Sequence, residues 1–448
     1  MLHAESADLT MKVAILSETF SKKMGYLPNL LPKYLARLGV DVHLIAMDLS
    51  PYYYVAPFEQ TYGDFVGAGG LTPGTVEFCD GFTLHVLSHK KQLGYMRMVG
   101  LRKRLRVLKP DIVQASAAIG WIPLDAALCI PFARYRLFTG SHMASSVFPL
   151  ARRISPWWAP ERLECALKRA VPGRLVSLVT EKCYTPTEDC ALIACRYFGV
   201  QPSKVEVMYL GIDTDYFYPA ISPSSLGERS RMRAHLGFQS DEIICIYTGK
   251  FTEDKKTLLL AHAVEQLRNE GLKCRALFIG NGPDRELLRA RPWVSALEFM
   301  PFCQLGSYYR AADLGVWPGN ESTSMLDAAA CGLPIIMSDE VFYRAPVDGE
   351  DQVFSKDSIE DLKRAILALR DSEKRQALGL KCAARMGRDF SWESIARRRL
   401  LDYEAALGLM RPSKAESAYV VGQSSGLSDS LEKFPLRDEL PGRREIGD

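Results

Sequence analysis

Two lysines stand where an α/β protein can hold a phosphate. Lys250 and Lys255 follow an apolar run that predicts a strand ending at Gly249. Ligands of open α/β sheets bind beyond the carboxyl ends of the strands, so positive charge at that place suits a diphosphate. A solvated lysine cluster would explain the same residues and remains an alternative.

A polar turn between two further apolar strands offers the complementary chemistry. A short helix is predicted to begin near Met325, so that its free N–H groups, together with the hydroxyls of Ser322 and Ser324, face a bound anion. Glu321 and Asp327 would flank that anion and accept hydrogen bonds from sugar hydroxyls. Ser324 and Asp327 also approximate a capping box, in which case Asp327 would serve only the first donors of its own helix.

Two glycine turns and one histidine complete the set of candidate residues. Gly280 lies in a Gly-Asn-Gly-Pro turn after a predicted strand, and Gly25 lies between the first predicted strand and helix. Both permit close approach of a backbone to a ligand, although ordinary turn chemistry explains them equally well. His142 directly follows a predicted strand, where it could donate to a sugar hydroxyl, move a proton or simply satisfy local backbone groups.

In order and spacing, these segments resemble the carboxyl-terminal half of GT-B retaining glycosyltransferases, in particular family 4 (glycosyl transferases group 1). The matching strings are Gly249 to Lys255, Gly280 to Pro283, Asp327 to Pro334, Tyr209 to Phe217 and Phe390 to Trp392. The resemblance is clear over residues 180 to 405 and looser before them. Lys250 replaces the usual arginine, Asp327 replaces the usual glutamate, and Glu321 precedes Asp327 by a shorter loop than the family has.

The resemblance implies transfer of a sugar from a nucleotide diphosphate sugar to an acceptor hydroxyl, with retention of configuration and without a metal or other cofactor. Asp327 would hold the ribose, Glu321 the donor sugar, and the two lysines the leaving diphosphate. His142 and Gly25 would reach the donor from the first domain. Carbohydrates and lipid-linked sugars are the expected acceptors, in polysaccharide or glycolipid synthesis. An epimerase, a phosphorylase and a non-catalytic nucleotide-sugar-binding protein remain alternatives.

Strand and helix patterns alternate along the chain and predict an α/β protein. The resemblance makes this a GT-B fold, with two facing Rossmann-like domains and a C-terminal crossover helix. We expect an acceptor-binding domain over 11–218, a nucleotide-sugar-binding domain over 241–388, the crossover helix over 391–408 and a disordered tail over 411–448. Residues 219 to 240, rich in proline, serine and charge, would link the domains.

Composition limits the partners and the location. A net charge of +3 over 448 residues gives no reason to expect nucleic acid, and eleven scattered cysteines suggest reduced thiols in a cytoplasmic protein. The apolar stretch from 115 to 133 contains Asp125 and predicts a buried helix rather than a membrane span. Two basic stretches, from Lys90 to Arg106 and from Arg152 to Arg174, predict peripheral contact with the inner face of a membrane; solvated helix faces are the alternative.

Overall fold

The computed structural model describes residues 10–53, 62–63, 65, 70–145, 147–151, 156, 158–320, 322–341, 344, 347 and 352–409. Glu321 and the tail over 411–448 lie outside these ranges. The chain divides into two compact units, one built from residues 17–88 and 210–398 and the other from the remaining segments. The predicted domain boundaries at 218, 241 and 388 remain predictions.

An eight-stranded sheet is formed by the N-terminal half of the chain, and it contributes strands to both units. Its strands, in spatial order, are β10 (Val205–Val207), β9 (Thr180–Thr185), β8 (Arg136–Gly140), β7 (Ile112–Ala115), β1 (Lys12–Ser17), β2 (Asp41–Met47), β4 (Phe82–Leu87) and β3 (Val76–Cys79). Strand β3 runs antiparallel to β4, whereas the pairings β1–β7, β7–β8, β8–β9, β9–β10 and β2–β4 are parallel. The helix predicted after Gly25 is confirmed as α1 (Leu27–Arg37), which begins with a proline in its first turn.

The structure of this half explains how Asp125 can lie within an apolar stretch. They are α3 (Leu101–Leu108), α4 (Trp121–Ala133), α5 (Pro160–Cys165), a π-helical turn (Ala166–Ala170), α6 (Val171–Val179) and α7 (Glu188–Phe198), beside the hairpin of β5 (His89–Gln92) and β6 (Tyr95–Met98). Asp125 is buried in α4 and forms ion pairs of 2.7 Å with both Arg97 and Arg102. These two arginines of the first basic stretch therefore have structural partners. Of the helices described, none has the length and apolar character that crossing a bilayer requires.

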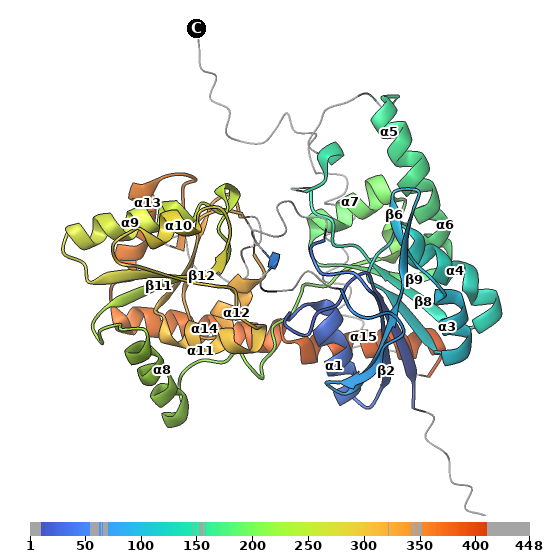
Figure 1. Cartoon of the computed structure of the whole chain (residues 1–448), viewed down its shortest axis with the longest axis horizontal. Coiled ribbons are helices and arrows are strands. Elements are labelled where there is room, and N and C mark those ends of the chain that lie inside the picture. Colours follow the sequence, from blue (N-terminus) through green and yellow to red (C-terminus); the bar gives the residue numbers. More distant parts are fainter. Residues whose placement is uncertain are drawn as a thin grey trace, which may run out of the picture. The chain divides into compact units, whose positions relative to one another are not determined.

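The second sheet has six described strands, and each of them runs parallel to its neighbours. Its spatial order is β13 (Val294–Leu297), β12 (Cys274–Asn281), β11 (Ile243–Lys250), β14 (Leu314–Trp317), β15 (Ile335–Ser338) and β16 (Val353–Phe354). In Figure 1, α9 (Thr257–Asn269), α10 (Arg285–Arg289) and α13 (Ile359–Ala368) lie on one side of this sheet, and α11 (Leu305–Ala311), α12 (Ser324–Ala330) and α14 (Ser372–Asp389) on the other. This order is that of the Rossmann fold, in which the chain reverses direction on either side of the first strand.

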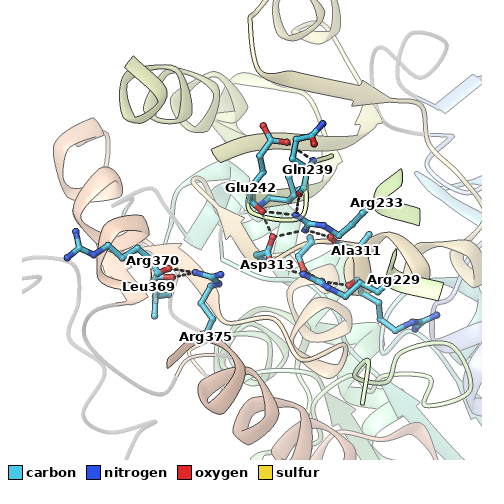
Figure 2. Close-up of polar contacts among 12 residues, drawn as sticks. Arg229, Arg233, Gln239, Glu242, Ala311, Asp313, Leu369, Arg370 and Arg375 are labelled. Carbon is cyan, nitrogen blue, oxygen red and sulfur yellow. Dashed lines mark hydrogen bonds and ion pairs between the residues drawn. The ribbon is translucent and has the colours of Figure 1, made fainter. Parts of the chain in front are cut away.

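The segment expected to link the domains contains a helix that belongs to the second fold. Helix α8 (Pro223–His235) begins with a capping box of Ser222 and Ser225, which explains the serine-rich composition. Arg229 and Arg233 of α8 bind the two carboxylate oxygens of Asp313, at 2.7 and 2.9 Å, just before β14 (Figure 2). The charges of this segment thus attach the helix to the sheet.

A helix is also found where the crossover helix was expected. Helix α15 runs over Trp392–Leu407, and the division between the two units falls inside it, at Arg399. Its C-terminal half packs on the first sheet, where Asp402 binds Lys182 and Tyr184 at 2.7 Å and the Tyr403 hydroxyl donates to Gln114 at 3.2 Å.

Candidate functional site

The second sheet reverses its direction of winding between β11 and β14. Successive connections leave these neighbouring strands on opposite sides, so the loops that follow them separate and leave room for a ligand at the carboxyl edge. The loop after β11 carries Lys250 and Lys255, and the loop after β14 carries Ser322 and leads into α12. The predicted phosphate-binding segments therefore meet at the point of the sheet where parallel α/β proteins bind their ligands.

The loop after β11 carries a partly exposed lysine, Lys250, and directs Lys255 to the neighbouring loop. Gly249 has a φ of 144°, and the Tyr247 hydroxyl donates to the Lys250 carbonyl at 2.9 Å. The ammonium group of Lys255 contacts the side chain of Asn320 in the loop after β14. Lys256 has a different task, because it forms ion pairs with Glu340 and Asp357.

The two loops touch closely enough to require a glycine. A Cβ at Gly319 would lie 2.2 Å from the carbonyl oxygen of Asp254. The Asn320 amide also donates to the Asp254 carboxylate, at 3.2 Å. Each loop therefore holds the other in place. Glu321, the predicted contact to the donor sugar, lies outside the described residues.

Helix α12 begins as predicted, but the capping-box alternative is wrong. Thr323 is the N-cap, and no side chain caps the helix. Ser324 instead donates to the carbonyl of Thr248 at the end of β11, at 3.1 Å, and shares a 2.7 Å hydrogen bond with Ser322. The amide of Met325 donates to Ser322 over 3.2 Å. The amide of Leu326 likewise donates to the Thr323 carbonyl, at 3.0 Å, so these two first-turn amides are already paired and the expectation of free N–H groups at their positions is wrong.

Asp327 lies one turn inside α12 and is the most perturbed acid of this edge. Burial and the charge of Asp213 raise its pKa well above the usual range. A carboxyl group that favours its protonated form can both donate and accept hydrogen bonds, which suits a pair of sugar hydroxyls.

Gly280 and Gly282 are required by the backbone itself. Gly280 has a φ of 159°, and a Cβ there would lie 1.8 Å from the Gly249 carbonyl oxygen. A Cβ at Gly282 would lie 2.4 Å from the carbonyl oxygen of Phe251. The turn after β12 therefore packs directly on the loop that carries Lys250. Gly280 shapes this edge through that contact, and its approach to a donor remains a prediction.

A buried charge network was missed by the sequence analysis. Asp213, fully buried, accepts hydrogen bonds of 2.7 Å from Lys33 and from the Tyr34 hydroxyl of α1. Lys33 also binds Asp215 at 2.7 Å. The Tyr209 to Phe217 string contained Asp213, but no signal in it pointed to partners so distant in the chain. The network holds a negative charge close enough to Asp327 to affect its protonation.

A buried pair of hydroxyls, those of Thr248 and Tyr309, lies beside the carboxyl end of β11. The hydroxyls of Thr248 and Tyr309 lie 2.6 Å apart and are buried. Burial raises the pKa of Tyr309 well above its ordinary value, so this phenol stays neutral. It therefore fixes the end of β11, from which Ser324 takes its position.

The remaining predicted residues are not gathered at this edge by any described contact. Gly25 packs against Phe302, since a Cβ there would lie 2.1 Å from the ring, and Phe302 donates to the Lys23 carbonyl at 3.1 Å. His142 follows β8 in the other unit, and it is exposed. Crowding by the protein and the positive charge of Arg399 lower its pKa to about 4. The imidazole of His142 is therefore neutral at pH 7.

Two family models match the chain, one in each half. The model "Glycosyltransferase Family 4" matches residues 30–216, and the model "Glycosyl transferases group 1" matches residues 242–372. The second match contains every predicted site residue of the second sheet, from Lys250 to Asp327.

Curated relatives and solved structures agree with these matches. A D-inositol 3-phosphate glycosyltransferase of Streptomyces bingchenggensis is 33% identical over 34% of this chain and 36% of its own length. An alpha-monoglucosyldiacylglycerol synthase of Acholeplasma laidlawii is 27% identical over 62% of this chain and 72% of its own. The chain thus spans only about a third of the first relative's length.

The fold itself recurs in solved glycosyltransferase structures. Sucrose-phosphate synthase from Thermosynechococcus elongatus superimposes with a TM-score of 0.62 at 16% identity, over 89% of this chain and 100% of that one. The Anabaena protein HepE in complex with UDP-glucose gives 0.59 at 15%, over the same shares. Two Rossmann-like folds with parallel sheets, matched in both halves, show that the chain belongs to the group 1 and family 4 glycosyltransferases of GT-B fold.

Proposed function

We propose that the protein transfers a sugar from a nucleotide diphosphate sugar to the hydroxyl of a lipid or carbohydrate acceptor. The observation that carries the proposal is the carboxyl edge of the second sheet, where Lys250, Lys255 and the first turn of α12 converge at the point of reversed winding. A cleaving glycosidic bond leaves negative charge on the diphosphate, and preorganised cations and amides stabilise that charge.

The chemistry of the edge supports a defined role for each group. Lys250 and Lys255 would bind the phosphate oxygens, and the protonated form of Asp327 would hold the ribose hydroxyls. Lysine provides a compact charge without the forked geometry of arginine, so Lys250 would stabilise charge more than it orients the phosphate. Glu321 and the neutral imidazole of His142 are proposed to bind the donor sugar.

The relatives support the class of substrates. HepE was solved with UDP-glucose, and the name of the Acholeplasma enzyme specifies a glucosylated diacylglycerol product. We propose a nucleotide-linked hexose as donor, retention of configuration and turnover without a metal ion. Product NMR at the anomeric carbon and assays with excess chelator test these two details.

The decisive experiment removes one cation and one carboxyl group from this edge. Lys255→Ala and Asp327→Ala should each lower kcat/KM by about a hundredfold or more, because each removes a group that contacts the donor. Lys273→Ala is the matched control: its lysine pairs with Asp241 at the opposite end of the sheet and should leave transfer unchanged. Near-normal turnover in both site variants, with circular dichroism spectra like the parent's, would refute the assignment.

A donor screen precedes that experiment. Thermal unfolding with UDP-, GDP- and ADP-sugars should show stabilisation by one base class, since a ligand at a hundred times its Kd adds about 2.7 kcal/mol to the folded state. The same donor should have no effect on Lys255→Ala.

A further inference from the structure

An exposed row of apolar side chains follows one continuous helical segment of the unit that contains residues 89–209. Residues 160–179 run through α5, the π-helical turn and α6. The row, which we call the outer ridge, consists of Leu163, Leu167, Val171, Leu175 and Leu178, with exposed fractions of 47%, 71%, 53%, 56% and 57%. Four of the five follow at intervals of four residues, which places them on one side of a helix.

The opposite side of the segment packs into the protein. Cys165, Gly173, Val176 and Ser177 are buried. A Cβ at Gly173 would lie 1.9 Å from the carbonyl oxygen of Phe198, so this contact is close. The orientation of the helix is therefore fixed by its inner face, and the leucines of the outer ridge point away from the core.

The neighbouring helix continues the apolar surface. Helix α4 packs beside α6, and both lie along the same border of the fold in Figure 1. Leu128 and Phe132, one helical turn apart in α4, are 50% and 75% exposed. Isolated apolar residues on a surface need no explanation, but a row of them that extends to a second helix indicates a binding surface.

Cations accompany the outer ridge and define its partner. The segment carries Arg162, Lys168, Arg169 and Arg174 against two carboxylates, Glu161 and Glu164. Lys168 and Arg174 are exposed between the leucines, Lys168 in a surface ion pair of 2.6 Å with Glu164, and Arg106 of α3 lies 6.0 Å from the ring of Phe132. Long basic side chains can lay their stems along apolar surface while their charged ends reach anionic headgroups.

We propose that the outer ridge docks the protein on the surface of an anionic lipid bilayer. The leucines would enter the boundary between headgroups and acyl chains, and Lys168 and Arg174 would bind lipid phosphates. A second copy of the chain is a poorer partner, because a twofold contact through this face would bring like charges together. The inference stands apart from the proposed transfer, since lipid binding requires neither donor nor acceptor.

The test uses the full chain and vesicle flotation. Vesicles of phosphatidylcholine with phosphatidylglycerol should bind the protein at low salt, and pure phosphatidylcholine vesicles should bind much less. Leu167→Gln with Leu175→Gln should lower the bound fraction about tenfold, because two apolar side chains no longer enter the bilayer. Lys168→Gln with Arg174→Gln should lower it and reduce its dependence on salt.

A matched control separates the ridge from general apolarity. Leu226 and Leu287, 47% and 56% exposed, lie in helices of the other unit, so Leu226→Gln with Leu287→Gln should bind vesicles like the parent. The four substituted residues, Leu167, Lys168, Arg174 and Leu175, are all exposed, so the variants should fold, which a thermal melt checks. Unchanged flotation of the leucine variant would overturn the proposal. So would a dimer in sedimentation velocity that the same leucine substitutions abolish.

Discussion

Asp327 and Asp213 show how single residues of this site depend on their surroundings. The buried carboxylate of Asp213 accepts hydrogen bonds from Lys33 and from the Tyr34 hydroxyl. That charge, together with burial, raises the pKa of Asp327. Helix α1 therefore influences the protonation of a residue in α12 through one buried carboxylate, without any contact to the proposed donor.

Asp327→Asn should change how stability depends on pH. An acid whose pKa is higher in the folded state binds more protons when folded, so its contribution is greatest below its ordinary value of 3.8 and is lost as the pH rises toward the folded pKa. The asparagine variant should therefore unfold at a higher temperature than the parent at pH 8 and lose that advantage near pH 4. Melting curves across this range measure it, and a variant less stable than the parent at pH 8 would contradict it.

Lys33→Met should be costly, because it leaves the fully buried Asp213 without its cation. We expect a loss of about 3 kcal/mol in the free energy of unfolding, measured with urea. Arg37→Gln is the control, since Arg37 is half-exposed in its pair with Asp215 and should contribute less than about 1 kcal/mol. Equal losses in the two variants would show that the buried Lys33 pair contributes no more to the free energy of unfolding than the exposed Arg37 pair.

Helix α8 shows how an element is held by charge rather than by an apolar face. Arg233 is buried, binds Asp313 and donates to the carbonyls of Gln239 and Glu242, each at 2.7 Å (Figure 2). Asp313 in turn accepts the Ile244 amide at 2.9 Å, at the start of β11. The helix, the start of the central strand and the approach to β14 thus share one carboxylate, which explains why a polar segment is part of the fold.

Arg233→Gln should detach α8 from the sheet. It leaves part of the charge of Asp313 uncompensated in a mostly buried place, and we expect a loss of about 3 kcal/mol. Arg375→Gln serves as the control: Arg375 donates to the carbonyls of Leu369 and Arg370 at the end of α13 and should contribute about 1 kcal/mol. Urea unfolding of both variants, followed by circular dichroism, makes the comparison. A smaller loss for Arg233→Gln than for Arg375→Gln would contradict the proposed tether.

The whole molecule repeats one architecture in two sheets, each with its own buried core. A chain divided into two compact units is not expected to unfold in a single two-state step. Lys250, Lys255 and Asp327 of the proposed donor site belong to the unit with the second sheet. A bound donor should therefore stabilise the unit with the second sheet more than the other unit.

Calorimetry should show this difference in the thermal transitions of the two units. We expect at least two thermal transitions, of which a bound nucleotide sugar raises one more than the other, because most of the proposed donor-binding residues belong to one unit. Lys255→Ala should remove the shift and leave the transitions of the free protein in place. A uniform shift of the whole profile would instead show that the two units unfold together.

Local patterns in the sequence determined much of this protein. Alternating apolar runs and helical periods predicted the α/β class, and the residues just after predicted strands predicted that Lys250, Lys255 and Ser324 would share one edge. Those inferences succeeded because a parallel strand places its carboxyl end at one edge whatever its neighbours are. Only the tertiary structure decided that α8 belongs to the second fold, that Ser324 bonds to β11 instead of capping its helix, and that Lys33 pairs with Asp213, 180 residues away. Such pairings depend on which surfaces the folded chain brings together and buries, and no local pattern of residue types encodes that.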